Sequence, residues 1–214
     1  YDRPPSVTYD RDKNFMLFLY RDNYKSIEDL SQKELRLAGL RINPKKNIGS
    51  RITYYNNVKI KNLKSKNSEI KDIIGIPDNP LIANINWSPN QKNIAFTNTS
   101  SDGVRLWVLN LESRSLTKLS DLKLNSNIGD VINWVNDNEI IVKVIPENKQ
   151  NLIDQDGIVP MGPTISSNEG ENAQNRTYQD LLKNKTDEFN FEQLVTSDLY
   201  LINLNGKTQK WLDA

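Results

Sequence analysis

The sequence predicts an all-β fold: a β-propeller segment of about three four-stranded blades, interrupted by two helical or irregular insertions. Three observations predict it. Short strands separated by turn residues dominate the chain. Four of these strands fit into about 40 residues, which is the size of one propeller blade. The pattern then begins again, and the repeat places Trp87 and Trp134 at matching positions, 47 residues apart.

Residues 1–80 are expected to form the first blade, with a helical insertion at residues 24–50. Residues 7–9 and 15–20 are largely apolar and flank a polar segment, which indicates a hairpin. Residues 51–63 alternate between apolar and polar side chains. This alternation predicts one half-buried strand over the whole of that range.

Residues 81–127 are expected to form the second blade. Its first two strands enclose a turn in which Pro89 takes the second position. Asp102 and Gly103 then signal a hairpin that leads into two further strands.

Residues 128–214 are expected to form the third blade, with an insertion at residues 146–196. A strand around Trp134 opens it, and Asn205 and Gly206 near its end predict a type I′ turn between two closing strands. The alternative is an antiparallel sandwich in which the two tryptophans coincide by chance.

Both insertions contain signals for the start of a helix. In the first, Ser31 is the expected N-cap, Glu34 completes a capping box and Gly39 is expected to end the helix. In the second, Thr177 and Asp180 form a capping box ahead of two leucines.

Composition excludes several functions. The 214 residues include no His and no Cys, so the chain has no imidazole or thiol for catalysis or metal binding and no disulfide. We therefore expect no catalytic residue, no metal and no cofactor in this chain. The net charge of +1 gives no support to nucleic acid as a partner. No stretch approaches the roughly 18 apolar residues that a membrane span needs. The chain starts with Tyr1 and not with Met, which predicts a processed or trimmed product.

Residues 36–68 contain nine Lys or Arg and no acidic residue. Most of these lysines are expected on the solvent-facing side of a strand. Arg41 and Arg51 differ, because they flank a turn that contains Pro44 and lies between the expected helix and strand. They are candidates to converge on one anion, since the planar guanidinium group binds carboxylates through two hydrogen bonds. The alternative is that they form ion pairs within the chain.

Six short motifs carry a resemblance that extends over nearly the whole chain. They are LAGLRI at 37–42, SRITYY at 50–55, NWSP at 86–89, LWV at 106–108, GPTIS at 162–166 and RTYQDLLK at 176–183. In this order and spacing they resemble the amino-terminal propeller of the prolyl oligopeptidase family of serine peptidases, and within it the glutamyl endopeptidase-like branch.

The resemblance implies a propeller that gates peptide access to an α/β-hydrolase domain. Three blades do not close a ring, so the remainder of the same polypeptide, with further blades and the hydrolase domain, is expected as a partner, and an oligomer or larger assembly is a separate option. It also implies a peptide substrate, and an acidic side chain recognised by Arg41 and Arg51. A periplasmic or secreted location is expected, with a cytoplasmic or plastid-like one as the alternative. The competing function is a non-catalytic propeller of the TolB-like or WD type that serves as a binding or assembly module.

Overall fold

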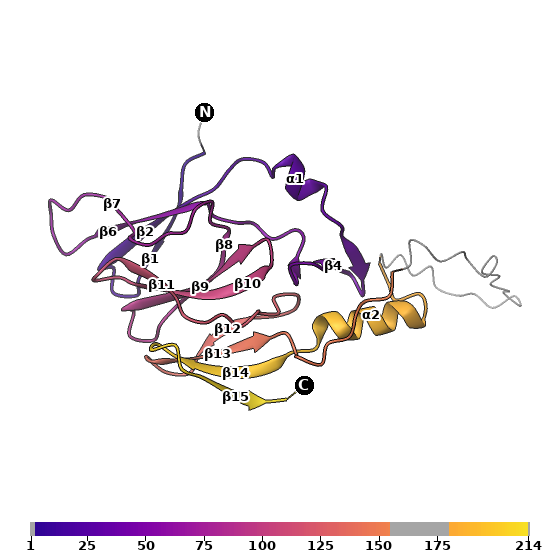
Figure 1. Cartoon of the computed structure of the whole chain (residues 1–214). Coiled ribbons are helices and arrows are strands. Elements are labelled where there is room, and N and C mark those ends of the chain that lie inside the picture. The colour runs from indigo at the N-terminus through magenta and orange to yellow at the C-terminus, as the bar shows by residue number, and fades with distance from the viewer. Residues whose placement is uncertain (1–2, 155–179, 214) are drawn as a thin grey trace, which may run out of the picture.

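Three four-stranded antiparallel sheets follow one another along the chain in the computed structural model, which describes residues 3–154 and 180–213. They are the three blades of a propeller segment, and Figure 1 shows them stacked in chain order. The first blade contains β1 (Ser6–Tyr9), β2 (Phe15–Tyr20), β6 (Asn57–Asn62) and β7 (Lys71–Asp72). The second contains β8 (Ile82–Trp87), β9 (Asn93–Ser100), β10 (Gly103–Asn110) and β11 (Ser115–Lys118). The third contains β12 (Ile132–Trp134), β13 (Glu139–Val144), β14 (Asp198–Asn203) and β15 (Thr208–Leu212).

The core lies between the blades, and the second blade is buried on both of its faces. Along β9, Ile94 and Phe96 pack in a cluster with side chains of the first blade, whereas Ala95 belongs to a cluster shared with the third blade. Successive side chains of a strand point to opposite faces of the sheet. A strand between two blades is therefore apolar at consecutive positions, and residues 93–97 are all buried.

The first strands of the second and third blades are joined by side chains. The Trp134 indole Nε1–H donates to the main-chain oxygen of Asn86 at 3.1 Å, and the Asn86 amide donates to the main-chain oxygen of Ile132 at 3.1 Å. Trp134 and Trp87 are both half-buried and pack against different core clusters. Both tryptophans thus contribute to the packing between blades.

The two insertions leave their blades at equivalent points and pack against each other. Each one follows the second strand of its blade, after β2 in the first and after β13 in the third. Equivalent strand ends lie on the same side of a propeller, so the two insertions meet there (Figure 1). Leu37, Ile42 and Leu194 form the buried centre of their contact.

The first insertion is mostly a small sheet. It holds one helical turn, α1 (Ile27–Leu30), followed by β3 (Leu35–Leu37), β4 (Leu40–Asn43) and β5 (Ile48–Gly49) in a three-stranded antiparallel sheet. The second insertion holds the helix α2 (Lys185–Val195). No helix among the described residues is long and apolar enough to cross a membrane.

The helix predicted to begin at Ser31 and end at Gly39 is wrong. Ser31 is instead the C-cap of α1, whose N-cap is Ser26. Glu34 does not cap a helix, and the chain continues as the strand β3. Ala38 and Gly39 have φ of +50° and +79° and form the tight turn of a hairpin between β3 and β4. Positive φ at both central positions is the mark of a type I′ turn, which favours a hairpin over a helix.

Three further predictions are corrected. The strand expected over residues 51–63 is shorter, because β6 begins only at Asn57. The turn at Asn205 is not type I′, since only Gly206 has a positive φ, of +80°. Helix α2 is capped by Asn184, whose side chain accepts from the main-chain nitrogen of Asp187 at 2.8 Å, so the helix starts later than the capping box at Asp180 predicted. Thr177 lies outside the described residues.

Candidate functional site

Arg41 and Arg51 line one cavity of about 500 Å³, below α1 and against the small sheet. Six cationic side chains surround it, with Asp29 and Glu34 as the acidic ones among its lining residues. The six are Lys25, Lys33, Arg36, Arg41, Lys46 and Arg51. The two arginines thus line the same cavity, although the element before Arg41 is a strand hairpin and not a helix, and their convergence on one anion stays a prediction.

The Arg41 guanidinium is held by two carboxylates. It lies on β4 with its side chain only 17% exposed. Its Nη1 is 2.9 Å from Oε1 of Glu34, and its Nη2 is 3.3 Å from Oδ2 of Asp180. The main-chain nitrogen of Gly39 also donates to the carbonyl oxygen of Asp180, at 3.0 Å. Arg41 therefore ties the small sheet to the second insertion.

Glu34 accepts from three side chains on different parts of the small sheet. Besides Arg41, Nε of Arg36 lies 3.1 Å from its Oε1, and the Ser50 hydroxyl donates to its Oε2. The Ser50 hydrogen bond, followed by those from Arg41 and Arg36, lowers the pKa of the Glu34 carboxyl from 4.5 to about 2. Glu34 is therefore a carboxylate at any ordinary pH.

Three cations of the cavity have no carboxylate partner among the described residues: Lys25, Lys46 and Arg51. Lys25 donates to the carbonyl oxygen of Ser50, and Arg51 is exposed in the turn after β5. Asp29, the other acidic residue of the cavity, is hydrogen-bonded to Ser26 and Gln32. The cavity keeps a surplus of positive charge on flexible or exposed groups, which suits an anionic ligand.

The wall of the cavity adds a neutral hydroxyl. Burial raises the pKa of the Tyr54 hydroxyl above its ordinary value of 10.0, so Tyr54 stays protonated at neutral pH. Guanidinium, ammonium and hydroxyl donors of this kind are suited to a carboxylate ligand. No cluster of acidic side chains suited to a metal ion occurs in residues 3–154 and 180–213.

Sequence reasoning missed Glu34, Ser50 and Lys25 as members of this site. Glu34 and Ser50 stand 16 residues apart, and neither has a neighbour that marks it as a partner of the other. The only available signal was the hairpin turn at Ala38 and Gly39, which pairs Arg36 with Arg41 across β3 and β4. Recognition of this turn would have placed Arg36 and Arg41 beside Glu34.

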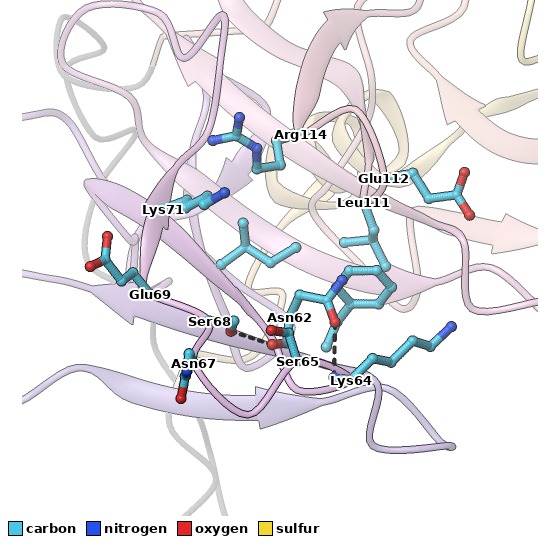
Figure 2. Close-up of a pocket in the computed structure, with 12 residues that line it drawn as sticks. Asn62, Lys64, Ser65, Asn67, Ser68, Glu69, Lys71, Leu111, Glu112 and Arg114 are labelled. Carbon is cyan, nitrogen blue, oxygen red and sulfur yellow. Dashed lines mark hydrogen bonds between the residues drawn. The ribbon is translucent and has the colours of Figure 1, made fainter.

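A second cavity, of about 540 Å³, lies between the loop after β6 and the loop after β10 (Figure 2). Three cationic and two acidic side chains line it, so its surplus of charge is small. They are Lys64, Lys71, Arg114, Glu69 and Glu112. Its polar groups also satisfy one another: the Ser68 hydroxyl donates to the carbonyl oxygen of Asn62, and the main-chain nitrogen of Lys64 donates to the Asn62 side chain at 2.9 Å. This cavity is a weaker candidate for a charged ligand.

Two curated plant proteins are similar to nearly the whole chain. A probable glutamyl endopeptidase, chloroplastic, of Oryza sativa subsp. japonica is 33% identical over 94% of the chain. The protein of the same name in Arabidopsis thaliana is 32% identical over 96% of it. The chain spans only 23% and 22% of the lengths of these relatives. No protein-family model matches the sequence. The resemblance drawn from the six motifs is confirmed.

Solved structures with some similarity include two peptidases. The AtxE2 isopeptidase has a TM-score of 0.37 at 16% identity, over 66% of this chain and 20% of its own. A Pyrococcus horikoshii acylaminoacyl peptidase has a TM-score of 0.36 at 16% identity, over 100% of this chain and 32% of its own. Scores this low establish no shared geometry, and the blade arrangement stands on the sheets of this chain alone.

Proposed function

We propose that this chain, the propeller part of a glutamyl endopeptidase-like member of the prolyl oligopeptidase family, controls which peptides reach a serine-peptidase domain of the same polypeptide and binds their acidic side chains. The observation that carries the proposal is the cationic cavity below α1, which both Arg41 and Arg51 line. The cavity lies on the side of the blades where both insertions pack together, and these insertions are the longest segments added to the four-stranded blades.

Arg51 and Arg41 have different roles in this proposal. Arg51 is exposed and has no carboxylate partner among the described residues, so it is the group that meets an incoming carboxylate first. Arg41 is already paired with Glu34 and Asp180, and it fixes the shape of the cavity as well as its charge. In this proposal the insertions also limit access to the cavity, because the first insertion lines it and packs against the second.

The remainder of the polypeptide is part of the proposal. The relatives are more than four times as long as the matched region, which supports further blades and a hydrolase domain outside these residues. The chloroplastic names of the relatives support the plastid-like location, and a periplasmic location stays a prediction. The division of the chain at residues 80 and 127 into three blades is likewise proposed.

The test uses the full-length protein and two peptide substrates that differ only by Glu or Gln. We expect Arg51→Ala to lower the Glu-to-Gln ratio of kcat/KM by roughly 10-fold or more, the loss typical of one charge-assisted hydrogen bond. Arg41→Ala should lower it as well. Lys66→Ala is the matched control, because Lys66 is an exposed cation outside the cavity. An unchanged ratio in both arginine variants would refute acidic recognition by this cavity.

A further inference from the structure

The carboxylate of Glu34 occupies the best carboxylate-binding groups that the cavity contains. Three donors from the small sheet converge on it: Nη1 of Arg41 at 2.9 Å, Nε of Arg36 at 3.1 Å and the Ser50 hydroxyl. Two guanidinium groups and a hydroxyl aimed at one carboxylate form the kind of donor set that binds an acidic ligand in other proteins. A side chain of this chain therefore fills the place that the ligand's carboxylate requires.

We propose that Glu34 is an internal competitor, whose carboxylate an acidic side chain of the substrate must displace to reach Arg41, Arg36 and Ser50. This inference rests on the proposed function. It makes Glu34 a specificity-determining residue that sets how strongly a ligand has to bind before it enters the full donor set.

The backbone around Glu34 is suited to such an exchange. Glu34 precedes β3 in a segment, residues 32–34, that belongs to no helix or strand. Its side chain is 25% exposed, so the carboxylate is not locked into the core. An irregular, partly exposed segment shifts at a lower cost than a paired strand.

A displaced carboxylate has a place to go. Glu34 lines both the cationic cavity and an adjoining cavity of about 460 Å³ between β3 and α2. Lys33 and Arg36 also line both cavities, and Asp154, Asp187 and Asn190 add further polar groups to the adjoining one. Movement of Glu34 toward that side vacates the donors without leaving its charge in an apolar setting.

Arg41 stays in position when Glu34 leaves. Its second guanidinium nitrogen remains paired with Asp180 at 3.3 Å, and Asp180 is itself fixed through its main-chain oxygen to the nitrogen of Gly39. The guanidinium group is therefore held ready for an incoming carboxylate. A neutral side chain such as Gln lacks the charge to displace Glu34, so the binding of an amide does not depend on this exchange, whereas the binding of an acid does.

The test measures binding of N-acetyl-glutamate and N-acetyl-glutamine to the full-length protein by calorimetry. We expect Glu34→Gln, which keeps the shape of the side chain, to raise the affinity for N-acetyl-glutamate by about tenfold. This factor is the typical contribution of one charge-assisted hydrogen bond to binding. The affinity for N-acetyl-glutamine should stay within about twofold. Glu34→Ala should act in the same direction, and thermal unfolding checks that both variants are folded.

Asp154→Asn is the matched control. It removes a carboxylate that lines the adjoining cavity and pairs with Lys33 at 2.9 Å, and among the described residues this carboxylate accepts nothing from Arg36, Arg41 or Ser50. If Glu34→Gln leaves the affinity for N-acetyl-glutamate unchanged or lowers it, Glu34 is a positioning residue and the competitor model is wrong. An equal gain in Asp154→Asn would reduce the effect to net charge and also overturn the inference. Failure of the proposed function is distinct, because there Arg51→Ala would leave the binding of N-acetyl-glutamate unaltered.

Discussion

The hydrogen bond from Trp134 to Asn86 offers a direct test of how the blades are joined. Trp134→Phe keeps an aromatic ring but removes the Nε1–H that donates to the main-chain oxygen of Asn86 at 3.1 Å. Trp87→Phe is the matched variant in the preceding blade. Trp87 is also half-buried, but it makes no such bond in the described part of the chain.

The expected difference between the two variants follows from this one bond. Both substitutions remove a similar apolar area, so that cost largely cancels. Loss of a partly buried hydrogen bond costs about 1 kcal/mol, and a carbonyl left without a donor adds up to about 1 kcal/mol more. We therefore expect Trp134→Phe to reduce local stability by about 1–2 kcal/mol more than Trp87→Phe does.

The assay is hydrogen exchange of the amides in β8 and β12, read by mass spectrometry under native conditions. Local opening free energies are the appropriate quantity, because global unfolding of a larger protein does not follow a two-state transition. Equal protection losses in the two variants would refute the conclusion that side-chain hydrogen bonds between first strands join the second and third blades.

Three other outcomes are expected. Gly75→Ala should lower the melting temperature more than Gly39→Ala. Both glycines have a positive φ, but only at Gly75 does the new Cβ come within 2.8 Å of the Leu116 carbonyl oxygen. Equal shifts in thermal unfolding would contradict this. The pKa of Glu34 is lowered in the folded state to about 2, so its stabilising contribution is complete above pH 4.5 and is lost as the pH falls toward 2. The free energy of unfolding should therefore decline over that pH window, and it should decline less in Glu34→Gln. Asn125→Ala removes two hydrogen bonds of 2.9 Å to main-chain oxygens at the end of α2. Hydrogen exchange of the α2 amides should therefore accelerate by roughly 10- to 100-fold. Unchanged protection of these amides would show that Asn125 does not anchor the helix.

The blades were predictable from the sequence because their signals are local. The alternation of apolar residues, the turn around Pro89 and the hairpin at Gly103 each act within a few residues, and β8 to β11 follow them. The repeat of Trp87 at Trp134 then indicated the third blade. Such short-range patterns survive folding best in the second blade, where each pair of hydrogen-bonded strands is also consecutive in the sequence.

The small sheet was not predictable in the same way. Ser31 and Glu34 have the spacing of a capping box, but the Glu34 carboxylate bonds instead with Arg41 and Ser50, which come later in the chain. Contacts with the second insertion, such as that of Leu37 with Leu194, favour strands over a helix in this segment. A tertiary contact therefore outweighs the local signal. The same reason hid the site, because its donors come together only in the folded sheet.

The relation of this chain to a peptidase is tested most directly by labelling the native protein with a fluorophosphonate, which reacts with activated serine nucleophiles. The labelled species are separated by mass and digested to identify any that contain residues 1–214. We expect a labelled polypeptide with a mass well above the 24.6 kDa of this chain. A native polypeptide that contains these residues and continues only into further blades, without label, would contradict the peptidase function and support a non-catalytic propeller.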